Sequence, residues 1–595
     1  MDLVKSKERT PSPARSDDGK RAKSPEPIAP ETESCSLLLP EKLPTERWIA
    51  LGVFTISLFY LYLFRRYTSM DPDEGIILQG AQRIVEGQVL YRDFFSYFTP
   101  GSYYLLALLF RAFGSSMLVA RTALAVYGAF FSVFTYLLAR RVCSRWVALA
   151  AAYLVTCTCL PWRFMILHNW DSTLWACATV YCAVRLLQAP RWGWALATGS
   201  FASLTVLFEQ SKGAGLILGL GLGLILLVLF ARSTLRLSRG QWVTLGIGLA
   251  WPFALTIAYF AAHHALPAML ADWFWPFHNY SKANSVPFGY MAWSDQTRQR
   301  LFGSGNWLVR GIVLFTVIPS FIIPVLPVVA IILLIYWILE AKKGALAKDR
   351  VAYYILVCSN LTGLLASVLV TRADVLHFTY LIPPLYLVLA WVMDGADIRG
   401  PLIRAIRPFV SLSILIMFTT LGMAFLVKIR SAKTIIDTRR GAVLVESSDA
   451  VLEYVQTHVP AGSRVLVYPY LPLYYYLTAT FNPTSFDYLQ PGMHTRQQEQ
   501  EAIHQVSADR TAVIVFQPSF SDSIAASWPK TSPASLASDP VADYILSHYR
   551  PCRVLASAFK SDWRFVFMVR KDLACPDTLH SDRRLPSGAQ PQAMK

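Results

Sequence analysis

Three acidic side chains within four residues, Asp71, Asp73 and Glu74, follow an apolar run that is long enough to cross a bilayer. Ionisable groups beside a membrane span are costly unless they are solvated, paired or used in chemistry, so this cluster is a candidate site. A carboxylate in such a place can accept the proton of an attacking hydroxyl group. The cluster therefore predicts a reaction at the membrane surface, with Asp73 or Asp71 as general base and Glu74 orienting the base or holding a divalent cation.

The same tetrapeptide also has a purely structural interpretation. Asp71 suits a helix N-cap, Pro72 suits the first helical position and Glu74 the third, and together they form a capping box. Apolar residues recur on one face of the segment that follows, and Gly87 can end the helix. Capping uses only Asp71 and Glu74, so it leaves Asp73 unexplained.

The composition places these residues in a membrane protein. Of the 595 residues, 54% are hydrophobic and only 16% are charged, and the apolar runs are about 20 residues long. The formal charge of +17 comes from Lys and Arg in short clusters between apolar runs. Such clusters set membrane topology, whereas a nucleic-acid-binding protein would gather them on one stripe. We therefore expect a polytopic all-α membrane protein without a nucleic-acid partner.

The N-terminal segment fixes the expected orientation. Residues 1 to about 46 are rich in Lys, Arg, Ser, Pro and Glu, which predicts a disordered tail. No apolar stretch follows the first basic residues, so the tail is not a signal peptide. A basic tail before a first span at about 47–64 predicts a cytoplasmic N-terminus, which puts Asp71 outside.

The later apolar runs extend this topology. The stretch 103–113 is too short to span and predicts a helix that lies in the outer interface. Further spans are expected at about 117–139, 146–163, 172–189, 193–210, 213–231, 242–262, 319–339, 351–370, 378–393 and 408–427. With this assignment the basic clusters fall on the cytoplasmic side. The transmembrane module 47–428 then has about 11 spans.

This topology gathers the unusual polar residues at the outer face, so that five outer segments can converge on one cavity. Besides the acidic cluster, the candidates there are Arg92, Asp93, Arg163, His168, Asp171, Lys212, Arg372 and His377. Cations would hold a leaving phosphate, and we assign that role to Arg163, Lys212 and Arg372. Arg92, Asp93 and His377 are further substrate-binding candidates, Asp171 is a further catalytic candidate, and His168 with Glu74 is the candidate metal site.

Each of these residues has a plainer alternative. Lys212 can extend from a helix end toward the interface, and Arg372 can pair with Asp374 as a loop brace. Isolated histidines at helix ends commonly hydrogen-bond locally, and Asp171 is a reasonable N-cap. The sequence leaves these alternatives open.

A different pattern begins at about residue 429. Short alternating segments predict strands at 464–468, 512–516, 553–556 and 564–569, with helices near 450–458 and 495–506. We therefore expect a small extracytoplasmic α/β domain over 429–575, followed by a disordered tail, 576–595. Cys552 and Cys575 are the only cysteines in this domain, which predicts a disulfide.

The chain resembles a known family in its first half. Asp73-Glu74 soon after the first span, the run 86–93 (EGQVLYRD) and the run 100–104 (PGSYY) resemble bacterial GT-C glycosyltransferases, near the dolichyl-phosphate-mannose protein mannosyltransferases and the aminoarabinose transferases. Asp171 and the segment 211–213 are similar too. The resemblance covers about 47–230 well and the remainder in outline.

The resemblance implies a function. It implies a polyprenyl-phosphate sugar donor, inversion at the anomeric carbon, and a catalytic acid in the first outer loop, which maps onto Asp73 or Asp71. The extra Asp71 departs from the pattern and leaves open which carboxylate is the base. The expected protein is an inner-membrane glycosyltransferase that transfers a sugar to a glycan, lipid or protein on the periplasmic face.

Two other function classes remain as alternatives. Pro319, Pro324 and Pro327 in one apolar run could break a helix, as transporter sites do. However, few ionisable residues lie near the middle of a span, where a coupled carrier needs them. A polymerase or ligase of lipid-linked glycans shares the outward chemistry but does not require the Asp73-Glu74 opening.

Overall fold

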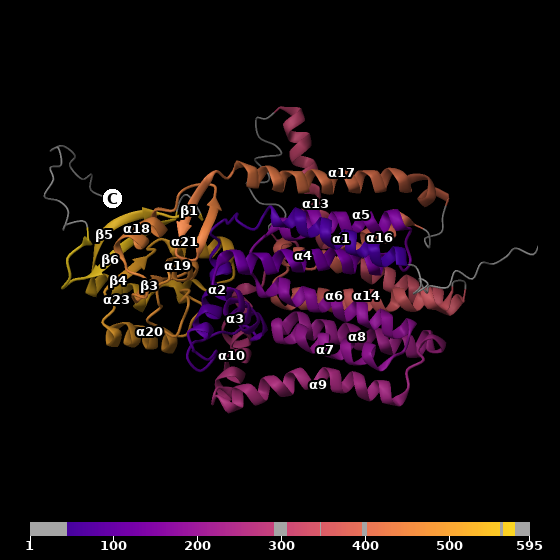
Figure 1. Ribbon diagram of the computed structural model, residues 1–595, viewed down its shortest axis with the longest axis horizontal. Helices are drawn as coiled ribbons and strands as arrows, with labels where there is room; N and C mark the ends of the chain where they lie inside the picture. Colours follow the sequence, from indigo (N-terminus) through magenta and orange to yellow (C-terminus); the bar gives the residue numbers. More distant parts are fainter. Residues whose placement is uncertain (1–43, 291–305, 345–346, 396–400, 560–562, 577–595) are drawn as a thin grey trace, which may run out of the picture. The chain divides into compact units, whose positions relative to one another are not determined.

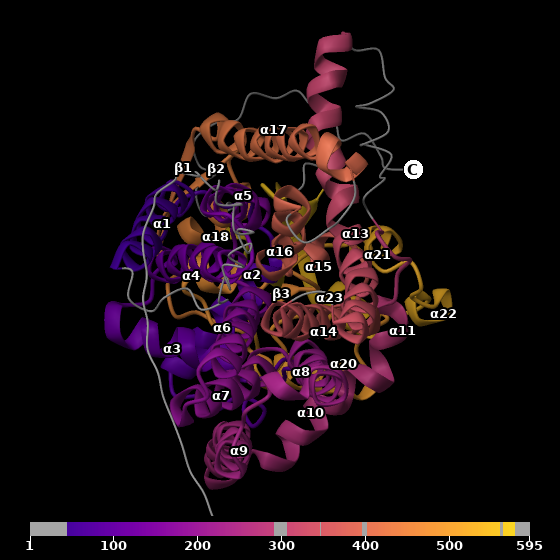
Figure 2. The ribbon, with the colours of Figure 1, turned by 90° about the vertical axis from the view of Figure 1, so that its right-hand side faces the viewer.

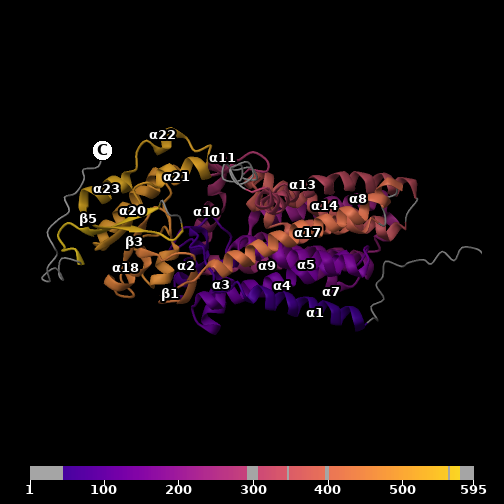
Figure 3. The ribbon, with the colours of Figure 1, turned by 90° about the horizontal axis from the view of Figure 1, so that it is seen from above.

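The computed structural model describes residues 44–290, 306–344, 347–395, 401–559 and 563–576. The predicted tails at 1–46 and 576–595 lie almost entirely outside these residues. The described residues belong to one compact unit. Figures 1 and 3 show long helices that run side by side, with the C-terminal strands beyond one end of them, next to α2.

The first four helices follow the sequence pattern. They are α1 (Pro44–Tyr62), α2 (Pro72–Val85), α3 (Gly101–Phe113) and α4 (Met117–Ala139). Asp71 is the N-cap of α2, and its side chain accepts a hydrogen bond of 3.1 Å from the Asp73 backbone N–H. Pro72 begins the helix, where its missing N–H costs nothing. The predicted short helix near 103–113 is therefore present as α3, and the predicted helix after Asp71 as α2.

Every other predicted span overlaps a helix. These helices are α5 (Arg145–Trp162), α6 (His168–Gln188), α7 (Trp192–Phe208), α8 (Gln210–Phe230), α9 (Arg239–Ala262), α13 (Trp307–Lys343), α14 (Lys348–Thr371), α16 (Ile382–Asp394) and α17 (Pro401–Ser431). The span predicted at 378–393 begins before the helix α16 does. Six of the described helices, α4, α8, α9, α13, α14 and α17, are long and apolar enough to cross a membrane. The helical membrane architecture is confirmed, while the count of about 11 spans stays a prediction.

The proline-rich run forms one helix. Pro319, Pro324 and Pro327 all lie inside α13, which continues from Trp307 to Lys343. The broken helix that the transporter alternative calls for is therefore not formed here. Figure 2 shows α13 beside α14 and α16.

The two ends of the helix bundle collect the segments that the topology assigned to opposite sides. At one end Glu46 pairs with Arg140 at 3.3 Å and with Arg145 at 2.7 Å, and Arg350 donates to the Val142 carbonyl at 2.9 Å. All these residues belong to segments that we assigned to the cytoplasm. The acidic cluster lies at the other end. Which end faces the cytoplasm stays a prediction.

The C-terminal part contains the predicted α/β domain. Its four-stranded sheet has the order β3-β4-β6-β5, with β3 (Val465–Tyr468) parallel to β4 (Val513–Phe516). Strands β5 (Tyr549–Ala556) and β6 (Arg564–Arg570) are antiparallel neighbours. A disulfide joins Cys552 to Cys575 with a Cα–Cα distance of 5.7 Å, as predicted. The hairpin of β1 (Thr434–Thr438) and β2 (Gly441–Val445) was not anticipated.

Helices of this domain surround the sheet and reach the membrane module. They are α18 (Ala450–His458), α19 (Leu473–Thr478), α20 (Arg496–Asp509), α21 (Phe520–Ser527), α22 (Pro533–Leu536) and α23 (Pro540–His548). The helix α19 packs against α2, and a Cβ atom on Gly75 would lie only 2.0 Å from the Leu473 backbone nitrogen. A buried ion pair between Arg83 and Asp487, with 2.6 Å between their charged atoms, also joins the two parts. These contacts hold α2 between the bundle and the domain.

Candidate active site

The three carboxylates of the acidic cluster differ sharply in exposure. The side chain of Glu74 is fully buried, that of Asp71 is 19% exposed and that of Asp73 is 40% exposed. Successive positions on the first turn of a helix point in different directions, so adjacent residues meet different surroundings. Of the three, Asp73 is the most accessible to a substrate.

Glu74 is enclosed by protein partners. Its carboxylate accepts hydrogen bonds from the Arg121 guanidinium and, at 3.0 Å, from the Ile166 backbone N–H. Arg121 is itself buried in α4 and also donates to the Tyr67 carbonyl. The second half of the predicted capping box is therefore not formed, because Glu74 turns toward the charge of Arg121 instead of the Asp71 backbone.

One guanidinium links the other two carboxylates. Arg163, at the C-terminal end of α5, lies 3.0 Å from Oδ2 of Asp71 and 3.3 Å from Oδ2 of Asp73. It also donates to the Tyr380 hydroxyl at 2.8 Å. Arg163 thus connects α2 to the segment that precedes α16 (Ile382–Asp394). The predicted cation is beside the predicted base.

The C-terminal domain contributes a hydroxyl to the same carboxylate. Tyr470 donates a hydrogen bond of 2.5 Å to Oδ1 of Asp73. Its ring contacts Tyr488 edge-on, at 5.1 Å between centroids. Trp528 lies beside the Tyr470 ring and donates to the Tyr280 hydroxyl at 2.9 Å. Asp73 therefore lies beside a cluster of aromatic side chains that come from both the membrane module and the C-terminal domain.

The surroundings of Asp71 change its titration. Burial raises the pKa of Asp71 to about 6, and the neighbouring charge of Asp73 acts in the same direction, while Arg163 opposes both. Asp71 therefore gains a proton as the pH falls through about 6. The carboxyl that caps α2 is a group whose charge changes close to physiological pH.

Lys212 belongs to a buried polar cluster. Its ammonium donates to the Asn169 carbonyl and the Ser172 hydroxyl at 2.8 Å each and to the Thr173 hydroxyl at 3.0 Å, and it pairs with Glu209 at 2.9 Å. An ammonium has three protons to donate, so these partners occupy it. Asp171, in the first turn of α6, is buried close by. In this structure Lys212 braces helix ends and does not extend toward the interface.

The predicted Arg372 cluster braces a loop as well. Arg372 pairs with Asp374, and donates to Asn284 at 3.1 Å and to the Ser527 carbonyl at 2.6 Å. His377 lies 2.7 Å from the other oxygen of Asp374. Burial alone would raise the pKa of Asp374, but His377 and Arg372 hold it well below its usual range. This cluster joins the membrane module to α21 of the C-terminal domain.

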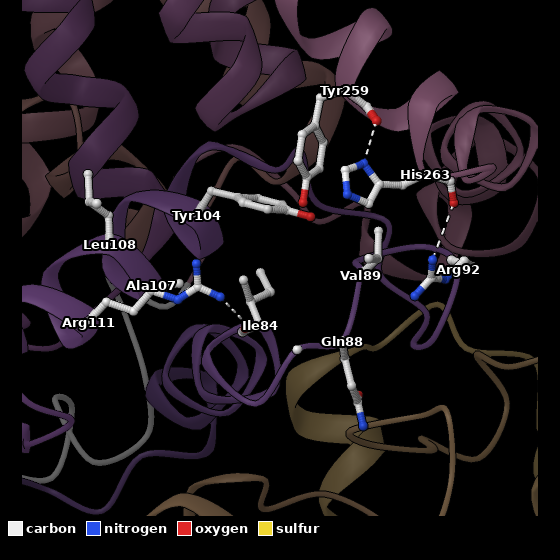
Figure 4. Close-up of a pocket in the computed structure, with 11 residues that line it drawn as sticks. Ile84, Gln88, Val89, Arg92, Tyr104, Ala107, Leu108, Arg111, Tyr259 and His263 are labelled. Atoms are coloured by element: carbon white, nitrogen blue, oxygen red, sulfur yellow. Dashed lines mark hydrogen bonds between the residues drawn. The ribbon is translucent and has the colours of Figure 1, made fainter.

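Arg92 and Asp93 lie apart from the acidic cluster. They pair with each other at 2.8 Å on the surface, and Arg92 donates to the His263 carbonyl. Arg92 lines a cavity of about 570 Å³ between α2, α3 and α9, with Arg111, Tyr104 and Tyr259 among the other lining residues (Figure 4). The structure does not bring this pair to Asp73.

The candidate metal ligands do not form a site together. Among the described residues, no group of three or more His, Cys, Asp and Glu side chains is placed to hold a metal ion. Both oxygens of Glu74 are engaged by Arg121, and the His168 ring packs on Phe98 with centroids 4.2 Å apart. These residues do not fit a divalent cation in this arrangement.

The sequence did not reveal Arg121 and Tyr470, the partners that give Glu74 and Asp73 different surroundings. Arg121 is an arginine inside an apolar span, and that alone marks it as paired or functional. Tyr470 carries no comparable signal, because it lies 397 residues from Asp73 in the chain and only the fold brings them together.

Part of the chain matches the model of a known family. Residues 98–274 match the model of the dolichyl-phosphate-mannose-protein mannosyltransferase family. The mannosyltransferase match runs from just before α3 into α10 (Leu266–Asn279), and confirms the resemblance over that segment. It includes Arg163, Asp171 and Lys212, whereas Asp71 and Asp73 precede it. No curated protein matches the chain.

Solved structures show similarity over most of the chain. ArnT from Cupriavidus metallidurans bound to undecaprenyl phosphate is 13% identical, with a TM-score of 0.47, over 89% of this chain and 98% of that one. Its apo state is 14% identical, with a TM-score of 0.48 and the same coverage. The Archaeoglobus fulgidus oligosaccharyltransferase complex with Zn and sulfate is 13% identical, with a TM-score of 0.41, over 86% and 72% of the two chains.

Proposed function

We propose that this protein is an integral membrane glycosyltransferase that moves a sugar from a polyprenyl-phosphate donor to a hydroxyl group of a glycan, lipid or protein acceptor, with inversion. The matched family is described by a dolichyl-phosphate-mannose donor, which is a sugar on a lipid phosphate. The several apolar helices suit a donor that is itself embedded in the membrane. Both observations support a lipid-linked substrate.

One observation carries the assignment of the base. Asp73 is the most exposed of three adjacent carboxylates, and Arg163 and Tyr470 fix it from two sides. An ionised carboxylate has about four acceptor sites, so two such bonds leave room for a substrate hydroxyl. Glu74 has no such room, because Arg121 covers it.

The reaction follows from this arrangement. The acceptor oxygen attacks the anomeric carbon and its proton passes to Asp73, while the bond from that carbon to the phosphate oxygen breaks and the lipid phosphate leaves with the electron pair. Attack opposite the leaving phosphate inverts the anomeric carbon. Arg163 lies beside Asp71 and Asp73, and its positive charge offsets the negative charge of these two carboxylates.

The proposal includes an orientation. The acidic cluster and the C-terminal domain face the periplasm, and the end that contains Glu46 and Arg140 faces the cytoplasm of an inner-membrane protein. The distribution of cations in the sequence supports this orientation. A cysteine introduced near Arg140 should be protected from an impermeant thiol reagent in intact cells, while one at the exposed position of Arg92 should react. Labelling near Arg140 in intact cells would show that the proposed orientation is wrong.

A direct assay tests the function. Purified full-length protein in detergent is incubated with a panel of polyprenyl-phosphate sugars and a membrane extract as acceptor source, and released polyprenyl phosphate is measured. We expect release with at least one donor in the wild type and loss of release in Asp73→Asn. A wild type that releases no polyprenyl phosphate from any donor would contradict the proposal.

A further inference from the structure

A second cavity lies between α2 and the C-terminal domain. Its volume is about 490 Å³, and its lining is mostly amide, hydroxyl and carboxylate side chains. The polar lining residues include Gln79, Glu86 and Asp93 from the membrane module and Asn482, Ser485 and Gln505 from the C-terminal domain. None of the sites described above uses this set, apart from Asp93. The cavity is therefore a polar surface separate from the acidic cluster, and it is formed by the membrane module and the C-terminal domain together.

One lining side chain is buried and has a free amide. Gln79 is only 2% exposed, yet its side-chain amide makes no hydrogen bond to any residue that the structure describes. Because Gln79 lines the cavity, water or a bound molecule there supplies the hydrogen-bonding partner of its amide. Gln79 therefore offers hydrogen-bonding positions to a ligand in the cavity.

The other polar groups are held in place. Nε2 of Gln505 donates to the Ser485 hydroxyl at 3.1 Å, and its Oε1 accepts from the Ser485 backbone at 2.8 Å. Asn482 accepts from the Thr484 hydroxyl at 2.9 Å. Groups fixed in this way present hydrogen-bonding positions without a further loss of conformational freedom on binding.

The charges of the cavity disfavour an anionic ligand. Arg83 is paired with Asp487, and Arg464 with Asp509, so neither arginine is an uncompensated anion site. Glu86 accepts a hydrogen bond of 2.7 Å from Gln82 and can accept another from a ligand hydroxyl. The ring of Phe481, which is 39% exposed, adds one apolar face to the polar lining. A ligand with many hydroxyl groups and one apolar face matches both features, because hydroxyls pair with amides and carboxylates while the apolar face covers the ring.

We infer that this cavity is a binding subsite for a neutral saccharide. Gln79 lies less than two helical turns after Asp73, a rise of roughly 9 Å along α2. Six residues also place Gln79 about 120° around α2 from Asp73, so an oligosaccharide held here would reach the acidic cluster by extending around the helix as well as along it. That the bound saccharide is a distant part of the acceptor rests on the proposed function, whereas the binding itself does not.

Binding to the full-length protein tests the inference. Wild-type protein in detergent is applied to an array of neutral oligosaccharides, acidic oligosaccharides and peptides, and the best neutral ligand is then titrated by saturation-transfer NMR. Gln79→Leu and Phe481→Ala should each weaken its binding by about tenfold, the effect of one lost good contact. Leu546→Ala, which removes an exposed apolar side chain of α23, is the matched control and should bind as the wild type does.

The outcomes separate this inference from the proposed function. Asp73→Asn should abolish transfer but retain saccharide binding. If the wild type binds no neutral oligosaccharide, or if both folded variants bind it as tightly as the wild type, the subsite is wrong. If only peptides bind and the variants weaken them, the cavity is a peptide site and the inference also fails. If the saccharide binds but no donor is turned over, the subsite stands and the glycosyltransferase proposal fails.

Discussion

Two neighbouring residues at the start of α2 meet opposite surroundings. Glu74 is sealed against Arg121 in the bundle, with no exposed side-chain surface. Asp73 faces Arg163 and Tyr470 with 40% of its side chain exposed. Both carboxylates have an arginine partner, so charge pairing does not tell them apart. Their exposure to solvent does, and it is the reason for proposing a structural role for Glu74 and a chemical role for Asp73.

The largest expected effect comes from the exposed carboxylate. Asp73→Asn keeps the shape of the side chain but cannot accept a proton at neutral pH, so the transfer rate should fall by about 10² to 10⁴. The melting temperature should stay close to that of the wild type. Both are measured on purified protein, by donor turnover and by thermal unfolding. Full activity in a folded Asp73→Asn protein would break the contrast between the two carboxylates.

The buried carboxylate should act on folding instead. Glu74→Ala leaves Arg121 as an uncompensated buried charge, which should destabilise the protein by about 3–5 kcal/mol. Replacing both residues, as in Glu74→Leu with Arg121→Met, should recover much of this loss because no charge remains buried. Thermal unfolding and the yield of folded protein measure the effect. A stable Glu74→Ala protein that is selectively inactive would place the chemistry at Glu74.

Asp71 should give the activity its dependence on pH. Its pKa is raised to about 6, so it is ionised above that pH and protonated below it. Once it is protonated, Arg163 binds Asp73 alone and competes with the incoming hydroxyl, so transfer should slow as the pH falls through about 6. Asp71→Asn still caps α2 but resembles the protonated form at every pH.

The pH profile of Asp71→Asn sharpens this point. We expect about a tenfold lower rate at neutral pH, comparable to one lost charge-assisted hydrogen bond, and no inflection near pH 6. Asp71→Ala, which also loses the cap, should in addition lower the melting temperature. An unchanged inflection in Asp71→Asn would assign it to another group.

Tyr470 should have the smallest effect. Tyr470→Phe removes one hydrogen bond to Asp73 and keeps the ring, so transfer should fall by about tenfold, the low end of the roughly 1.5–3 kcal/mol that a hydrogen bond to a charged group contributes. Steady-state turnover at saturating donor measures the change. A loss as large as that of Asp73→Asn would mean that the hydroxyl itself takes part in proton transfer.

Local patterns predicted the elements well. The cap at Asp71, the boundaries of α4 and the four strands of the C-terminal sheet each depend on residues within a few positions of one another. The β1–β2 hairpin was missed because the chain turns directly from a long helix into two short strands. In the site, proximity of Arg163 to the acids followed from topology alone.

The partners of the carboxylates could not be derived in the same way. The sequence offered Lys212 and Arg372 as phosphate-binding cations, with an Arg372–Asp374 brace as the alternative, and the structure confirms that brace. Their other acceptors include the Asn169 and Ser527 carbonyls, which lie on other elements and leave no sequence signal. The pairing of Arg121 with Glu74 instead of solvent depends on the fold placing the start of α2 beside α4. Such contacts are set by packing and leave no periodic signal.

The distance in sequence between Asp73 and Tyr470 has a consequence for synthesis. The two are 397 residues apart, and chains grow at about 5–20 residues per second, so roughly 20–80 s pass between the making of one and of the other. During that interval α19, which packs closely against Gly75, has not been made. The carboxylate of Asp73 also lacks the hydroxyl of Tyr470. The ribosome therefore completes the membrane helices first, and the working site is assembled only when the last quarter of the chain arrives.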